Sequence, residues 1–231
     1  MKITPKLLHV KFIKRYKRFF VDVELNKKKV TVHCPNSGSM QGLLNEGNKA
    51  WISKSDNPNR KLKYTIEIIN DGNSNVGVNT HRANRIVEEA LQNKKFKELK
   101  KYSSIKREAK FSKETRFDFF LENKNNKAFL EVKNVTLSRN KGISEFPDAI
   151  TTRGKKHLVH LQDAIKQGYE TYLLFLIQRE DPKSMKIAND IDPEYFEEIK
   201  KAKKNGVKIL AYSCKVQENE ISVNRNIKVN I

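Results

Sequence analysis

Asp118, Glu131 and Lys133 are residues whose types and spacing could hold a divalent metal ion beside a phosphodiester. Asp118 lies inside RFDFF, where burying a carboxylate among aromatic side chains is costly unless a partner compensates. Glu131 and Lys133 are two residues apart, so in a strand they point to the same side. If the two segments pair as a hairpin, all three side chains meet on one face. The alternative is a surface hairpin with an ordinary Glu/Lys pair, because E-x-K strings are common by chance.

Two clustered carboxylates repel each other, and a divalent cation relieves that repulsion. Mg²⁺ commonly takes one or two carboxylates and completes its shell with water and substrate phosphate. Such a metal polarises the phosphate and lowers the pKa of a bound water. Lys133 would orient that water or neutralise the charge that develops on phosphorus. We therefore predict that Asp118 and Glu131 bind Mg²⁺, or Mn²⁺, and that all three residues are catalytic.

The net charge of the chain is +20, with a pI near 9.8, which points to a polyanionic partner. The first 81 residues carry 15 Lys and Arg against 6 Asp and Glu, and the rest carry 32 against 21. Because both halves are basic, the contact surface is expected to span both. A nucleic acid, DNA or RNA, is the predicted partner. A bias of the genome towards lysine and asparagine codons is the alternative explanation.

Two segments place basic residues where they could contact phosphates. KFIKRYKRFF alternates basic and aromatic residues, as in barrels that bind single strands, and the loop PNSGSM suits close backbone approach to a ligand. FPDAITTRGKKHL falls at or just before an expected helix start, where backbone N–H groups favour phosphate. Each could equally be a solvated face or a tight connection. The predicted nucleic-acid-binding residues are Arg15, Lys17, Arg18, Asn36, Ser37, Arg116, Arg153, Lys155 and His157.

Two further features stay open. Asp148 is either another site acid or the cap of the turn after Pro147. His157 and His160 are three apart on one helical face, so they could form a metal pair, although packing is the more ordinary explanation.

The elements that must position these residues divide the chain in two. Residues 7–81 read as five or so short strands separated by turns, which predicts a small barrel. Apolar residues then recur at helical spacing over 83–92. Later segments alternate between strands and helices, with helices expected at 157–168 and 193–206 and each closed by a glycine. The fold class is therefore α/β with a mixed sheet, and the predicted domains are 1–82 and 83–231.

The chain has no apolar stretch of ~18 residues or more, so no membrane partner is expected. The N-terminal segment lacks the pattern of a signal peptide. Cys34 and Cys214 are isolated and suggest neither a disulfide framework nor a zinc site. We expect a cytoplasmic protein, and a homodimer is one option for its oligomeric state.

The pattern Asp118…Glu131-x-Lys133 resembles the PD-(D/E)xK signature of nucleases with the restriction-endonuclease-like fold. The longer motifs HCPNSGSM, VNTHRANR, EAKFSKETRFDFFL, EVKNVTL, FPDAITTRGKKHL and GVKILAY resemble the sugar fermentation stimulation protein A family nearly end to end. This resemblance implies an OB-like β-barrel joined to a restriction-endonuclease-like domain whose mixed central sheet is flanked by helices. It also implies DNA binding and a link to sugar (maltose) metabolism.

One residue departs from the broader nuclease signature, since Phe117 stands where proline is usual. Proline is not chemically required there, so activity is not excluded. Many nuclease folds also use a glutamate from the helix before the first core strand. Glu89 is the candidate by order along the chain, and Glu108 is the alternative. An ordinary exposed helix acid is the other explanation for Glu89.

Two hypotheses follow from these residues. The first is a DNA-binding, Mg²⁺-dependent nuclease with low sequence specificity, because no base-reading motif is present. The second is a non-catalytic DNA-binding regulator of sugar (maltose) metabolism that uses a nuclease fold. Clustered carboxylates would repel DNA phosphates unless they are metal-loaded, which favours the first.

Overall fold

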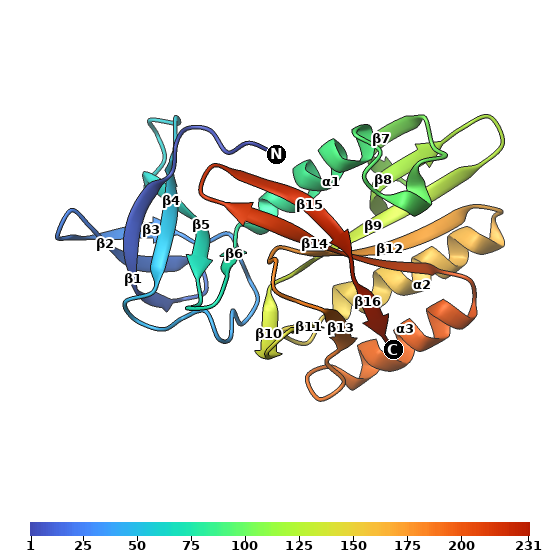
Figure 1. Cartoon of the computed structure of the whole chain (residues 1–231). Helices are drawn as coiled ribbons and strands as arrows, with labels where there is room; N and C mark the ends of the chain where they lie inside the picture. Colours follow the sequence, from blue (N-terminus) through green and yellow to red (C-terminus); the bar gives the residue numbers. More distant parts are fainter.

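Short strands form a closed barrel in the first part of the chain (Figure 1). The computed structural model describes all residues from 1 to 231. The strand order is β3-β2-β1-β4-β5-β6, and the pairing of His33 with Thr65 joins β3 to β5. Phe12, Val23 and Ile66 are fully buried inside, so the small barrel predicted from the strand spacing is confirmed. The bounds are β1 Leu8–Tyr16, β2 Phe20–Leu25, β3 Lys28–His33, β4 Lys49–Lys54, β5 Tyr64–Asn70 and β6 Asn75–Gly77.

A mixed sheet forms the centre of the second part, as predicted, and the structure shows that it has six strands. Its order is β15-β14-β12-β9-β8-β7; β12 runs parallel to β9 and β14, and the other neighbours are antiparallel. The apolar run in β12 is buried throughout, as expected of a central strand. The bounds are β7 Ser104–Lys110, β8 Arg116–Glu122, β9 Lys127–Val135, β12 Glu170–Ile177, β14 Lys208–Gln217 and β15 Glu220–Asn226.

Three helices cover the two faces of this sheet. α1 (Ala83–Gln92) packs on one face, and α2 (Thr152–Lys166) and α3 (Pro193–Lys204) pack on the other. α1 has the predicted bounds. α2 begins five residues before its predicted start, because the Thr151 hydroxyl caps the helix by accepting from Gly154 N at 3.1 Å. The expected glycine stops after α2 and α3 are present, with φ of +86° at Gly168 and +101° at Gly206.

A second, four-stranded sheet was not predicted. It consists of β10 (Leu137–Asn140), β11 (Ile143–Phe146), β13 (Ser184–Ile187) and β16 (Lys228–Asn230) in the order β10-β11-β13-β16. Its strands are short and partly polar, and they pair with segments far away in the chain. It continues from the end of β9, which carries Glu131 and Lys133 (Figure 1).

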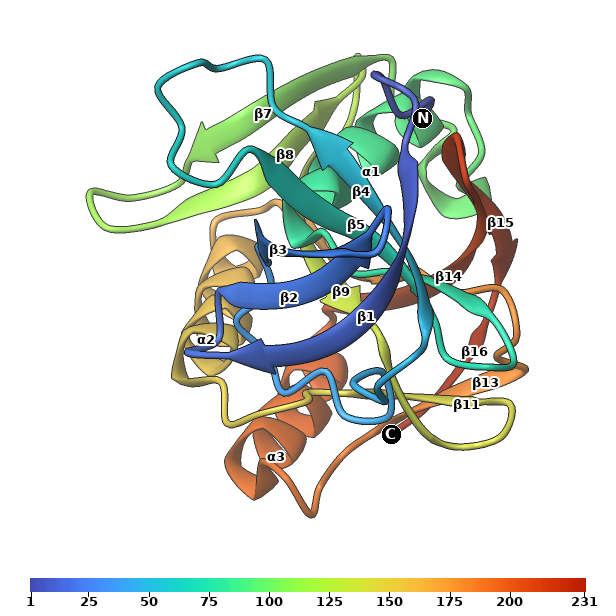
Figure 2. The same cartoon turned by 90° about the vertical axis from the view of Figure 1, so that its left-hand side faces the viewer.

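The barrel and the α/β part share core packing and polar contacts. Trp51 of the barrel belongs to the same buried cluster as α1. Arg179, almost fully buried, donates to Asp71 at 2.8 Å across the boundary, and Gly77 N donates to Gln178 O at 2.8 Å. Figure 2 shows the β7–β8 hairpin and α2 on the same side of the barrel. These contacts fix the barrel relative to the hairpin that carries Asp118. No helix has the length and apolar character needed to cross a bilayer.

Candidate metal and nucleic-acid site

Strands β8 and β9 bring Asp118 next to Glu131. Phe119 pairs with Leu130 and Phe120 with Phe129, so Asp118 and Glu131 face each other one step further along the same register. Asp118 Oδ2 accepts from Val132 N at 2.7 Å, and Asp118 Oδ1 accepts from Asn84 Nδ2 at 2.7 Å. The aspartate is thus held between the neighbouring strand and the first turn of α1.

The Glu131 carboxylate is buried, with a residue exposure of 3%. Its Oε1 accepts from Lys133 Nζ at 2.7 Å and contacts Nδ1 of His157 on α2. Burial alone would raise the pKa of Glu131, but Lys133 and His157 hold it below its ordinary value. Its second oxygen, Oε2, is buried and has no hydrogen-bond partner, so the site retains an unsatisfied acceptor.

Asp118 has the opposite pKa shift. Burial and, next, the charge of Glu131 raise the pKa of Asp118 to about 6, against the bonds from Val132 N and Asn84. A second negative charge is therefore costly here. A divalent cation would relieve that cost, and the free Glu131 Oε2 would be an oxygen ligand, so these residues fit such an ion. No set of three or more His, Cys, Asp or Glu side chains has the geometry to hold a metal alone, which leaves backbone, water or substrate to complete its shell.

A polar cavity of about 500 Å³ opens beside Asp118 between the β7–β8 hairpin and α2. Glu108 lines it, whereas Glu89 does not and instead accepts from the Met1 amino group at 2.7 Å. Glu108 lies opposite Asp118 in the β7–β8 register. Its φ is +50°, a left-handed conformation that costs a non-glycine residue about 1–2 kcal/mol and that clusters at functional sites. The lining residues are Glu108, Lys113, Glu114, Thr115, Arg116, Asp118, Arg153, Lys156, His157 and His160.

The basic residues at the start of α2 differ in what they contact: some line this cavity and others pair with protein side chains. Arg153 lines the cavity, and its Nε donates to His157 Nε2 at 3.3 Å. His157 contacts the Glu131 carboxylate and also lines the cavity. Lys155 forms an ion pair with Glu194 on α3. Because α2 starts at Thr152, these residues lie within its first two turns and not before the helix.

A second cavity, of about 370 Å³, lies between the barrel and the α/β part. Arg18, Asn36 and Ser37 line it from the barrel side, and Lys133 lines it from β9. Lys133 is also bonded to Glu131, so the Lys133–Glu131 pair lies between this cavity and the one beside Asp118.

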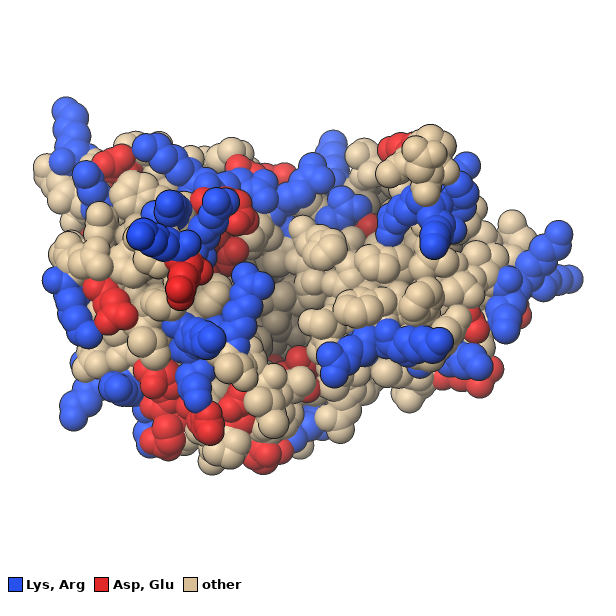
Figure 3. Space-filling model, turned by 180° about the vertical axis from the view of Figure 1, so that it is seen from behind, with Lys and Arg blue, Asp and Glu red and all other residues tan.

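Arg15 and Asp148 support the loop that lines the second cavity. The Arg15 guanidinium donates to the carbonyls of Asn36 at 2.6 Å and Gly38 at 2.8 Å, so most of its donors serve the protein itself. A Cβ at Gly38 would lie 2.0 Å from Asp148 Oδ2, so any larger residue there would require the Asp148 side chain to move. Lys17 lies in the β1–β2 turn, with φ of +47°. Figure 3 shows Lys and Arg side chains bordering a hollow on the rear face of the molecule.

Asn84 is a site residue that the sequence reasoning missed. It stands in VNTHRANR, one of the motifs that carry the family resemblance, but its amide reaches Asp118 only because α1 packs against β8. A polar residue in the first turn of an amphipathic helix was the single available signal.

Two family models match the chain. One, described as the SfsA N-terminal OB domain, matches residues 13–78, and the other, described as the Sugar fermentation stimulation protein RE domain, matches residues 81–220.

Full-length relatives are also similar. The Sugar fermentation stimulation protein homolog of Pelagibacter ubique is 55% identical over 229 residues, covering 99% of each chain. That of Agrobacterium fabrum is 42% identical, covering 99% of this chain and 97% of the relative. The solved structure of Pyrococcus furiosus SfsA in complex with Ca²⁺ matches with a TM-score of 0.90 and 23% identity, over 100% of this chain and 98% of the other. The last comparison shows that the fold is the same.

Proposed function

The chain belongs to the sugar fermentation stimulation protein A family, and on that premise we propose that it is a divalent-metal-dependent phosphodiesterase acting on DNA. The observation that carries the proposal is the pair of adjacent carboxylates, Asp118 and Glu131, with Glu131 Oε2 buried and unpartnered. A purely structural ion pair has no need of a second acid or of a free acceptor.

Each residue of the site has a role in this proposal. Asp118 and Glu131 hold Mg²⁺ or Mn²⁺, which when bound polarises the scissile phosphate and acidifies a water. Asn84 and Val132 N fix the Asp118 carboxylate, as partners behind metal ligands commonly do. Lys133 Nζ, held by Glu131, donates to the phosphate or the attacking water. His157 orients the Glu131 carboxylate from α2.

Support for a divalent cation also comes from a relative. The Pyrococcus furiosus protein was solved in complex with Ca²⁺. Ca²⁺ and Mg²⁺ both prefer oxygen ligands, which two carboxylates supply here. Glu108, which lines the cavity beside Asp118, is our candidate for a further catalytic acid rather than a metal ligand. The catalytic role of Glu89 remains a prediction that has no geometric support.

The substrate we propose is a nucleic-acid strand without sequence preference. Exposed basic residues Arg116, Arg153 and Lys156 line one cavity, and Arg18 lines the other, so phosphates on both sides of the scissile bond would find cations. Glu131 is nearly inaccessible at 3% exposure. A recessed carboxylate suits a single strand better than the broad surface of a duplex. Action in the cytoplasm is part of the same proposal.

The second candidate function is a DNA-binding regulator of sugar (maltose) metabolism that does not cut. One observation favours it: Lys133 and His157 already lower the pKa of Glu131, so half of the acid pair is neutralised by the protein alone.

A cleavage assay separates the two functions. Labelled single- and double-stranded DNA and RNA are incubated with wild type, Asp118→Ala and Lys133→Ala in Mg²⁺ or Mn²⁺. The matched control is Glu122→Gln, at the other end of the same hairpin and paired with Lys127. We expect cutting by wild type and control, and loss in both site variants. Metal-dependent cutting that survives both substitutions contradicts the nuclease proposal, and absence of cutting by wild type with intact DNA binding supports the regulator.

A further inference from the structure

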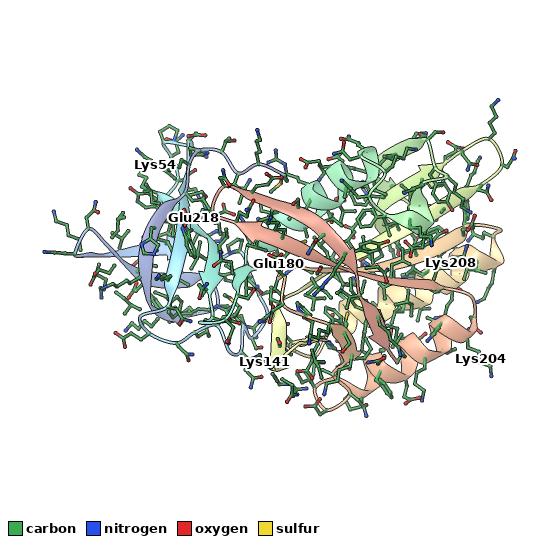
Figure 4. The ribbon with its side chains drawn as sticks, viewed as in Figure 1. Lys54, Lys141, Glu180, Lys204, Lys208 and Glu218 are labelled. Atoms are coloured by element: carbon green, nitrogen blue, oxygen red, sulfur yellow. The ribbon has the colours of Figure 1, made fainter.

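The barrel carries another cavity that shares no lining residue with the two beside Lys133. Its volume is about 400 Å³, and none of its 14 lining residues is hydrophobic. It lies between the end of β3, the β4–β5 loop and the 3₁₀ turn Thr80–Arg82. Figure 4 shows Lys54, one of its lining residues, at the barrel end of the molecule. Small-molecule pockets are usually mostly apolar, so a wholly polar one indicates a polar or charged ligand.

A buried carboxylate holds an arginine at the wall of this cavity. Glu67 is 1% exposed; its Oε1 accepts from Ser53 Oγ and Arg82 Nη2 at 2.7 Å each. Its Oε2 accepts from Asn79 Nδ2 at 2.9 Å and Arg82 Nε at 3.1 Å. Both oxygens are satisfied, so Glu67 is poorly placed to bind a cation. Arg82 is fixed in orientation, and its Nη1 donates to no protein group.

Two further groups in the cavity have no protein partner. The Arg60 side chain is half-buried and makes no hydrogen bond or ion pair, and the buried Nδ1 of His33 has no partner. Burial, followed by the charges of Arg60 and His81, lowers the pKa of His33, which shows how closely these basic groups approach each other. Two carboxylates line the cavity. Glu67 binds Arg82, whereas Asp56 is exposed at the rim and does not bind it.

We propose that this cavity binds a phosphate group through Arg60, Arg82 and His33. Arginine presents paired N–H donors that match phosphate oxygens, and a buried imidazole supplies a further donor. A bound dianion also relieves the mutual repulsion of the basic groups. The phosphate could come from a free phosphorylated small molecule or from the terminal phosphate of a nucleic-acid chain. The inference does not depend on the catalytic activity of Asp118 and Glu131.

The first experiment titrates inorganic pyrophosphate into the full-length protein, in EDTA, by calorimetry. Wild type should bind saturably, and Arg60→Ala should weaken binding by about tenfold or more because a charge-assisted pair is lost. Lys61→Ala removes the same charge from the next, exposed residue, which does not line the cavity, and should change affinity less than about twofold. Equal losses in both variants, or no saturable binding by wild type, would overturn the proposal.

A second variant and a second ligand complete the test. His33→Gln should also weaken pyrophosphate binding, whereas Asp118→Asn should not, so failure here is distinguishable from failure of the nuclease proposal. Oligonucleotides with a 5′-phosphate or a 5′-hydroxyl are then compared by fluorescence anisotropy in EDTA. A gain from the 5′-phosphate that Arg60→Ala removes identifies the nucleic-acid end as the source. Binding of pyrophosphate without that gain identifies a free small molecule as the source. If neither effect is observed, the proposed phosphate site is overturned.

Discussion

Glu67 in the barrel and Glu131 in the α/β part are both buried carboxylates beside a cation, but their surroundings differ. Glu67 has four donors for its two oxygens and no acid next to it. Glu131 has one oxygen without a partner, and Asp118 lies beside it. A buried carboxylate whose oxygens are all hydrogen-bonded is typical of a structural role. One that is left partly unsatisfied next to a second acid is a candidate for ligand binding.

The largest effect expected from this difference concerns activity. Glu131→Gln should lower metal-dependent cleavage of single-stranded DNA by about 10²–10³-fold or more, because a ligand that supports transition-state charge is lost. Glu67→Gln, read in the same initial-rate assay, should change the rate less than about tenfold while the protein remains folded. Similar rate losses in the two variants would remove the functional distinction between the two carboxylates.

The free energy of unfolding should depend strongly on Glu67. Glu67→Ala leaves Arg82 with an uncompensated, mostly buried charge, so the free energy of unfolding should fall by about 3–5 kcal/mol in urea titrations. Glu24→Gln, which removes an exposed acid of the same barrel, should cost less than about 1 kcal/mol. If the buried and the exposed variants unfold at the same urea concentration, Glu67 does not have the structural role assigned to it.

The dependence of stability on acid pH should reveal the raised pKa of Asp118, which lies beside Glu131. The pKa of Asp118 is raised from 3.8 to about 6, so the native state binds its proton more tightly than the unfolded state does. In EDTA, this group therefore destabilises the fold as pH rises from about 4 to 6, by at most about 3 kcal/mol. The comparison of wild type with Asp118→Asn isolates this contribution from other carboxylates. A difference between the two proteins that stays constant over that pH range contradicts the raised pKa.

The smallest effect should come from the residue behind Asp118. Asn84→Ala removes the amide that donates to Asp118 Oδ1, so Mn²⁺ affinity should fall by about 10-fold, as when other partners of metal ligands are removed. Asn79→Ala, which removes the equivalent amide from Glu67, is the matched control and should leave Mn²⁺ affinity unchanged. Equal affinity in wild type and Asn84→Ala would show that Asp118 does not need this support.

Much of the fold could be predicted because local sequence determines it. The alternating pattern of the short strands predicted the barrel. The apolar spacing over residues 83–92 predicted α1 with the observed bounds. The start of α2 was missed because TTRGKK has no apolar residue to reveal a helix, and Thr151 caps it by a local hydrogen bond. The β10-β11-β13-β16 sheet was missed because Ile143 pairs with Ser184, and Ser184 with Lys228, far apart in the chain.

The candidate site was predictable where it depends on one hairpin. Strand periodicity and a short turn were enough to bring Asp118 to Glu131 and Lys133. The choice between Glu89 and Glu108 was not predictable, because it depends on how α1 and β7 pack against β8. The same holds for basic residues such as Arg15 and Lys155, whose partners are set by the tertiary fold. The amino-acid composition shows that these residues are charged, but it does not show which protein groups pair with them.

Equilibrium binding of Mn²⁺, measured by calorimetry without substrate, tests the central claim most directly. Wild type should bind the ion at the Asp118–Glu131 pair, and both Asp118→Asn and Glu131→Gln should lose that binding while Glu122→Gln retains it. Binding of Mn²⁺ by both site variants with the stoichiometry and affinity of wild type would contradict a metal site at Asp118 and Glu131.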